Sequence, residues 1–177
     1  SPIVRLGCSP ERPPALPRAL EAIANADLIV LGPGSLYTSL LPNLLVPELV
    51  GAIKRSKAPR LYICNLMTQP GETDGLDVRG HIRAIEAQLA TLGIEPRLFT
   101  AVLAQDDLPE SDLVRYYQSR GADPVRCDAE GLRSDGYDVT QAPLQGVRPT
   151  ATLRHDSRSL ALAVMRFYRT HRRERDQ

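Results

Sequence analysis

The chain contains no Trp, only two Phe and two Met, and three Cys among its 177 residues. Cys8, Cys64 and Cys127 are odd in number and far apart, and none has a C-x-x-C partner or a neighbouring His at metal-ligand spacing. We therefore expect reduced thiols instead of a disulfide framework. No apolar run approaches the roughly 18 residues of a membrane span, and no basic segment followed by an apolar one opens the chain. These absences predict a cytoplasmic protein without a membrane span.

Charge of one sign is also scarce, because 22 Lys and Arg nearly balance 21 Asp and Glu. A net charge of +1 argues against a nucleic-acid-binding or membrane-surface protein and favours a small polar ligand. The apolar fraction of 42% suits one packed domain over residues 1–177, with a disordered tail expected at 173–177. Since the chain opens with Ser1 instead of Met, we expect it to be a fragment of a longer protein.

Strands and helices alternate along the chain, which predicts an α/β fold with a mainly parallel sheet and right-handed crossovers. Buried strands are predicted at 27–31, 60–64 and 97–104, because these runs are apolar without polar alternation. The other predicted segments are helices at 18–25, 47–56, 78–93, 111–120 and 157–172, a short strand at 124–127, and an irregular Gly- and Pro-rich segment at 131–149.

The first candidate site is the loop after the strand at 27–31. In an open parallel sheet, ligands bind at the carboxyl ends of strands, where small residues let backbone N–H groups and hydroxyls approach a phosphate. The order of residues matches neither G-x-G-x-x-G nor the P-loop pattern, and a tight turn capped by Ser and Thr is the alternative. The clustering of polar groups favours a site. The residues predicted to bind ligand are Gly32, Pro33, Gly34, Ser35, Tyr37, Thr38, Ser39 and Asn43.

A second candidate loop, residues 65–75, follows the strand at 60–64 and is expected to share a crevice with the first. Asn65 and Thr68 are suited to hydrogen-bonding a base, sugar or phosphate. Glu72 or Asp74 is suited to a ribose hydroxyl or a divalent ion. Alternatively, Thr73 or Asp74 caps the next helix. The predicted ligand-binding residues of this loop are Asn65, Thr68, Glu72 and Thr73.

Two further groups are weaker candidates. Asp106 and Asp107 follow the third strand, where they would bind a metal or act as a general base, unless they only begin a turn. Arg154 and His155 precede the last helix, where Asp156 or Ser157 is the predicted N-cap. The Arg154 guanidinium is suited to a phosphate or carboxylate. His81 has either a crevice or a packing role. No nucleophile spacing supports a Ser-His-Asp triad.

Three segments resemble, in the same order, motifs of the YvcK/CofD-like proteins, a family also called gluconeogenesis factors. Residues 26–46 look like the central motif of the YvcK branch, and residues 65–75 and 154–156 look like two later motifs. The resemblance extends from about 22 to 164 and is least distinctive at 121–152. It implies a Rossmann-like three-layer sandwich. It also implies a missing N-terminal portion, since the family's first strand with its Gly-rich turn and acidic loop does not occur here.

The resemblance further implies a function. The YvcK branch is known for binding UDP-sugars, notably UDP-N-acetylglucosamine, and for controlling carbon metabolism, cell-wall synthesis and cell shape. The CofD branch transfers a 2-phospho-lactyl group from a GDP-linked donor to a deazaflavin with Mg²⁺. The Gly-Ser-Leu-Tyr-Thr-Ser loop is the version associated with the YvcK branch, so a non-catalytic UDP-sugar-binding regulator is expected. The alternatives are a 2-phospho-L-lactate transferase that uses Mg²⁺, and a piece that mainly supplies sheet surface for a homo-oligomer.

Overall fold

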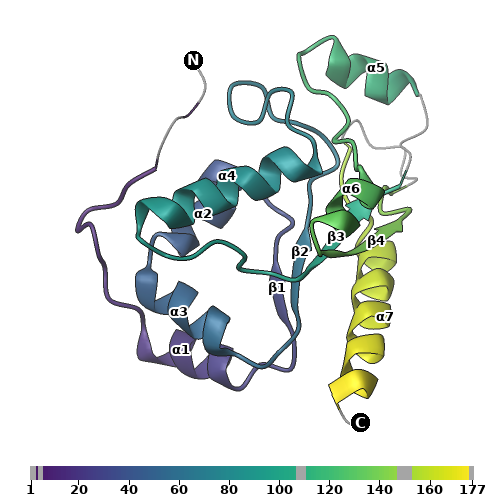
Figure 1. Cartoon of the computed structure of the whole chain (residues 1–177). Helices are drawn as coiled ribbons and strands as arrows, with labels where there is room; N and C mark the ends of the chain where they lie inside the picture. Colours follow the sequence, from purple (N-terminus) through teal and green to yellow (C-terminus); the bar gives the residue numbers. More distant parts are fainter. Residues whose placement is uncertain (1–2, 4–5, 107–110, 147–152, 176–177) are drawn as a thin grey trace.

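The computed structural model describes residues 3, 6–106, 111–146 and 153–175, with side chains to residue 172 (Figure 1). Its centre is one sheet of four parallel strands in the order β1-β2-β3-β4. The predicted α/β class with a parallel sheet is therefore confirmed. The strands are β1 (Ile29–Leu31), β2 (Arg60–Ile63), β3 (Ala101–Gln105) and β4 (Asp138–Ala142).

The register of the sheet brings the four strand ends to one edge. Leu31 pairs with Tyr62, Ile63 with Leu103, and Gln105 with Ala142. Because all strands run in parallel, the loops that follow them emerge side by side at their carboxyl ends. Both predicted ligand-binding loops start at this edge.

One face of the sheet carries most of the helices, as expected when strand order follows chain order and every crossover has the same hand. Its core joins Leu31 and Val102 of the sheet to Val50, Ile85 and Leu132 of the helices, all at most 8% exposed. The helical elements that precede α7 in the chain are α1 (Pro17–Ala24), η1 (Leu36–Leu40), α2 (Leu41–Leu44), α3 (Pro47–Arg55), α4 (Val78–Thr91), α5 (Asp112–Gln118) and α6 (Ala129–Ser134). Tyr117 of α5 packs with the core on the other face of the sheet.

Helix α7 (Ser157–Arg175) covers the other face and completes the three layers (Figure 1). Ala163 and Phe167 lie one turn apart on α7 and pack with Leu61 and Leu103 in a second core. Asp156 accepts a hydrogen bond from the Ser159 N–H at 2.8 Å, as expected of the predicted cap. The helix continues to Arg175, beyond the end predicted near residue 172 and into the segment predicted as a tail.

Two predictions for the stretch between β3 and α7 are wrong. The segment 131–149, predicted to be irregular, contains most of α6 and all of β4. Only Val139 of β4 is fully buried, so this edge strand lacks the apolar run that marks the central strands. The segment 124–127 is not a ladder strand. Pro124 has no N–H to donate, and the segment instead makes a bridge at Met67 and a 2.9 Å bond from the Val125 N–H to the Leu66 carbonyl.

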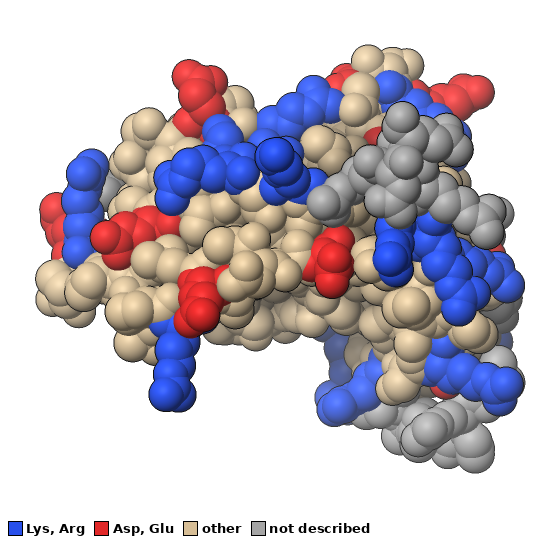
Figure 2. Space-filling view, turned by 90° about the horizontal axis from the view of Figure 1, so that it is seen from below, with Lys and Arg blue, Asp and Glu red and all other residues tan. Residues whose placement is uncertain are grey.

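No single helix within the described ranges is both long and apolar enough to cross a bilayer. The bent pair of segments Leu36–Leu44 and Pro47–Arg55, which turns through 78°, passes that test of length and composition only when taken together. Several of its apolar residues, among them Leu36, Leu41 and Val50, are at most 1% exposed within the fold. Figure 2 shows the basic side chains in several separate groups, with acidic side chains between them across the same face.

Candidate functional site

The turn at Gly32 is built so tightly against β2 that only glycine fits. Its φ is +89°, a left-handed conformation that residues with a Cβ rarely adopt. A Cβ placed on Gly32 would also lie 2.6 Å from the Ile63 carbonyl oxygen. The glycine therefore lets the chain reverse at the end of β1 while remaining in contact with the end of β2.

Residues 36–40, predicted as part of a loop, form the short helical turn η1. The N–H groups of Ser39 and Leu40 both donate to the Ser35 carbonyl at 3.0 Å, which gives a widened turn. Burial of Leu36 holds this turn against the core, because the side chain is 0% exposed. Thr38 and Ser39 are exposed and Tyr37 is half-buried, so their polar groups face the solvent edge of the loop.

Asn43, at the end of the same segment, is used within the turn. Its Nδ2 donates to the Ser39 carbonyl at 2.7 Å. The side chain is exposed, and its Oδ1 is a hydrogen-bond acceptor. Pro33 is exposed as well, while Gly34 is half-buried.

The second loop is held together by its own hydroxyl and carboxylate groups. Thr73 is 0% exposed and its Oγ1 accepts from the Gln69 N–H at 2.8 Å. Asp74 accepts from the Gly71 N–H at 2.7 Å. Neither residue caps the following helix, because Asp77 does so by accepting from the Gly80 N–H at 2.6 Å. The predicted capping role of Thr73 or Asp74 is therefore wrong, and both stabilise the loop instead.

Thr68 connects this loop to a distant segment. Its N–H donates to the Asp123 carbonyl at 2.7 Å, and its Oγ1 accepts from the Asp123 N–H at 2.8 Å. The side chain is 4% exposed. Thr68 thus aligns the segment that follows α5 along the carboxyl edge of the sheet.

A direct hydrogen bond joins the two predicted loops. Ser35 Oγ donates to Glu72 Oε2 at 2.8 Å across 37 residues of sequence. Asn65, the first residue of the second loop, is half-buried directly after β2. The loops after β1 and β2 therefore lie side by side at the edge, which is the arrangement expected of a shared crevice.

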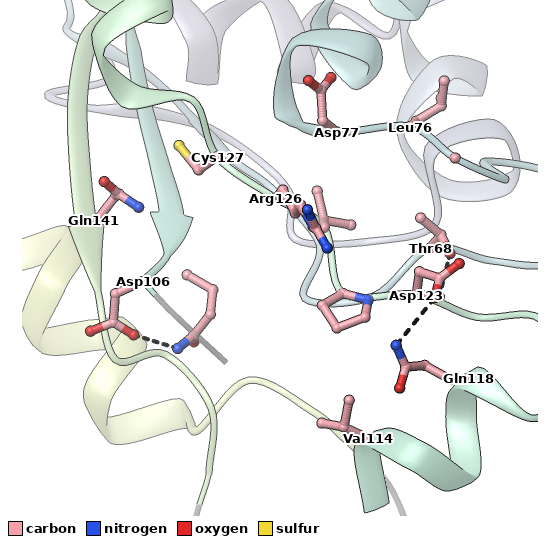
Figure 3. A pocket seen from close by; sticks show the side chains of 14 residues that line it. Thr68, Leu76, Asp77, Asp106, Val114, Gln118, Asp123, Arg126, Cys127 and Gln141 are labelled. Carbon is pink, nitrogen blue, oxygen red and sulfur yellow. Dashed lines mark hydrogen bonds between the residues drawn. The ribbon is translucent and has the colours of Figure 1, made fainter. Parts of the chain in front are cut away.

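Next to the second loop, at the carboxyl ends of β3 and β4, a cleft of about 820 Å³ opens (Figure 3). Sequence reasoning found two of its residues, Thr68 and Asp106. The others come mostly from the stretch between β3 and α7, where no motif stands out in the sequence. We call this cavity the β3–β4 cleft; its lining residues are Thr68, Gly75, Leu76, Asp77, Gln105, Asp106, Val114, Gln118, Asp123, Pro124, Val125, Arg126, Cys127 and Gln141.

Carboxylates and amides dominate the polar lining of the β3–β4 cleft. Asp106 Oδ1 accepts from Gln105 Nε2 at 2.6 Å, and Asp123 Oδ1 accepts from Gln118 Nε2 at a long 3.4 Å. The Gln105 Oε1 in turn accepts from two backbone N–H groups after β4 and is fixed by them. Figure 3 shows Arg126 among these side chains, and it is the one basic group among the described lining residues.

His155 lies at the end of β2, where its ring hydrogen-bonds the backbone of Cys64. Burial lowers the pKa of His155, so the neutral ring is favoured at neutral pH. Its Nε2 is buried and has no hydrogen-bond partner among the described residues. Arg154, beside it in the chain, is exposed. The structure therefore brings His155 close to the start of the second loop, at Asn65.

His81 packs inside the fold. The side chain is 0% exposed and its Nδ1 lies 2.8 Å from the Asp77 carbonyl oxygen. Desolvation lowers the pKa of His81. Its Nε2, like that of His155, is buried without a partner in the described part of the chain. The packing interpretation of His81 is the one its burial favours.

The cysteines are free thiols, in agreement with the expected reduced state. Burial raises the pKa of Cys64 to about 12 and also raises that of Cys127. Within the described ranges, no cluster of three or more His, Cys, Asp or Glu side chains is placed to hold a metal ion. Asp107, the second metal candidate, lies outside the described residues, so the carboxylate pair stays a prediction.

Comparisons with known proteins assign the chain to a family. The family model described as 2-phospho-L-lactate transferase CofD matches residues 1–145. A relative from Nostoc sp. (strain PCC 7120) is 45% identical over 166 residues, which are 94% of this chain and 36% of that protein. The gluconeogenesis factor of Bacillus subtilis (strain 168) is 36% identical over 90% of this chain and 48% of its own length.

A solved structure has the same fold. The crystal structure of a UPF0052 family member from Bacillus halodurans superposes with a TM-score of 0.81 at 37% identity, covering 93% of this chain and 50% of that one. The chain accordingly belongs to the CofD family and is similar to its gluconeogenesis factors. It spans between about a third and a half of the length of the curated relatives it matches.

Proposed function

We propose that this chain is the C-terminal part of a regulatory protein that binds a nucleotide-sugar, with UDP-N-acetylglucosamine as its ligand. The observation that carries the proposal is the 2.8 Å hydrogen bond from Ser35 to Glu72, which joins the two polar loops at the carboxyl edge of the sheet. In an open parallel sheet this edge is where nucleotide ligands bind. The processes regulated are carbon metabolism, cell-wall synthesis and cell shape.

The Gly32 loop is the phosphate subsite in this proposal. It presents the hydroxyl groups of Thr38 and Ser39 to solvent. The segment from Gly32 to Asn43 has no carboxylate of its own, and the Glu72 carboxylate that contacts it is bound by the Ser35 hydroxyl. In this proposal the backbone N–H groups that follow Pro33 would donate hydrogen bonds to the phosphate. Asn65 and Glu72 of the second loop would then contact the ligand next to its phosphates. His155 lies near Asn65, because its ring hydrogen-bonds the backbone of Cys64.

The test is binding of UDP-N-acetylglucosamine to the full-length protein that contains this chain, measured by calorimetry and by the melting temperature. A ligand at about 100 times its Kd stabilises the folded state by about 2.7 kcal/mol, which shifts the melting temperature upward. Thr38→Val removes one exposed hydroxyl and is expected to weaken binding by about 0.5–1.5 kcal/mol. Thr170→Val on α7 is the matched control. Absence of binding by every UDP-sugar would refute the proposal.

A second candidate function is a 2-phospho-L-lactate transferase, which the description of the matching family model favours. Asp106 lies in the β3–β4 cleft, where a carboxylate would contribute to binding Mg²⁺. Turnover of a deazaflavin acceptor with the GDP-linked donor, dependent on Mg²⁺ and abolished by Asp106→Asn, would support this function. The transferase function would be excluded if the full-length protein bound a UDP-sugar but showed no such turnover.

A further inference from the structure

Resting on the proposed function, we propose that the β3–β4 cleft receives the uncharged glycosyl group of the nucleotide-sugar, and that its carboxylates reject acidic sugars. The cleft is a polar cavity beside the second loop, which the Ser35–Glu72 hydrogen bond joins to the first, and its volume of about 820 Å³ lies within the range typical of small-molecule sites. Its residues Gln118, Asp123, Arg126 and Gln141 lie outside the three motifs that point to the nucleotide.

The position of the cleft fits a ligand that runs along the edge of the sheet. The phosphate loop follows β1, whereas the cleft lies at the ends of β3 and β4. Adjacent strands are about 4.8 Å apart, so about 10 Å separates the end of β1 from the end of β3. A diphosphate bonded to a hexose covers a comparable distance. With the phosphates beside Gly32, the sugar therefore reaches the cleft.

The lining has the chemistry of a sugar site. Sugar hydroxyls are donors and acceptors, and the cleft offers carboxylate oxygens together with side-chain amides that both donate and accept. Gln118 and Gln141 are exposed to the cleft from opposite sides, α5 and β4. The 3.4 Å contact between Gln118 and Asp123 is long, and a sugar hydroxyl between the two groups would make shorter bonds to both.

The same lining is poorly suited to the other parts of the ligand. Bases are usually held by stacking on aromatic side chains, and none of the described residues that line the cleft is aromatic. Among the described lining residues, a phosphate would meet the carboxylates of Asp77, Asp106 and Asp123 and one guanidinium, that of Arg126. This excess of negative charge disfavours any anion, including the carboxylate of a uronic acid. The cleft therefore selects a neutral, hydroxyl-rich group.

The preference for neutral sugars is expected to be moderate and sensitive to salt. Asp77 and Asp123 are exposed, so solvent and ions screen their repulsion. We expect the full-length protein to bind UDP-glucose and UDP-N-acetylglucosamine about 5-fold or more tightly than UDP-glucuronate at low ionic strength. That ratio should fall as salt is added.

Calorimetry with these three ligands and UDP alone tests the inference on the full-length protein and its variants. Asp123→Asn is expected to lower the neutral-to-acidic ratio at least about 3-fold, because it removes one carboxylate and keeps the side-chain size. Asp27→Asn, at the opposite end of β1, removes the same charge far from the cleft and should leave the ratio unchanged. A Gln118→Ala, Gln141→Ala double variant should weaken the UDP-sugars while leaving UDP binding unchanged.

Different binding results refute sugar selection by the cleft and nucleotide-sugar binding itself. UDP-glucuronate binding as tightly as the neutral sugars, or a ratio that Asp123→Asn does not change, overturns the inference and leaves nucleotide-sugar binding standing. If none of the UDP compounds binds, both the proposed function and the inference fail. Melting curves show whether Asp123→Asn folds. If it does not, Asp106→Asn replaces it, and the neutral-to-acidic ratio is again expected to fall.

Discussion

Replacing Gly32 with Ala tests how the turn after β1 is built. Two separate costs are expected. A residue with a Cβ at φ +89° is strained by about 1–2 kcal/mol, since left-handed conformations disfavour L-residues by that amount. The added Cβ also meets the Ile63 carbonyl oxygen at 2.6 Å, so the end of β2 or the turn must move, at a further cost of about 1–2 kcal/mol. Together these predict a loss of about 2–4 kcal/mol.

Gly71 provides the matched control. It has φ +80°, yet a Cβ added there meets no atom within 4 Å. Gly71→Ala therefore carries only the conformational cost of about 1–2 kcal/mol. The measurement is thermal or denaturant unfolding of both variants in the full-length protein, with UDP-N-acetylglucosamine binding as a second readout. A Gly32→Ala variant no less stable than Gly71→Ala would refute the proposed contact with β2.

Three more predictions follow from single contacts. Ser35→Ala removes the hydrogen bond to Glu72 and should lower the free energy of unfolding by about 0.5–1.5 kcal/mol. Calorimetry should also show weaker nucleotide-sugar binding. Unchanged affinity would mean that this hydrogen bond is not part of the ligand site. Burial lowers the pKa of His81 below its unfolded value of about 6.5. As the pH falls below that value, the unfolded state takes up the proton and the folded state does not. The free energy of unfolding should therefore decrease by up to about 1.4 kcal/mol for each pH unit, until the folded pKa is reached. His81→Gln should reduce this slope in unfolding measured across pH 5–8, and an unchanged slope would contradict the assignment. Val30, 40% exposed on β1, tests whether the chain self-associates through the edge of its sheet. Light scattering should then show that Val30→Lys lowers the oligomer fraction, and a monomer at all concentrations would exclude this contact.

The sequence alone was sufficient for the central layers of the fold. The apolar runs that became β1, β2 and β3 can be buried only between two layers, so they predicted a covered parallel sheet. Helical spacing likewise located α4 and α7. Each helix has apolar residues repeating along one face, and these include Leu89 of α4 and Phe167 of α7. β4 was missed because an edge strand with one fully buried residue has no comparable pattern.

The candidate site was only partly predictable. The order of Gly32 and the polar residues after it indicated a strand-end loop, and local sequence also predicted the Asp156 cap. The bond from Ser35 to Glu72, the alignment of Asp123 by Thr68, and the cleft beyond them depended on contacts between segments far apart in the chain. Composition and periodicity report which residues are buried along one element. Which side chains face each other across the carboxyl edge is decided by strand order and register, and these exist only once the sheet has formed.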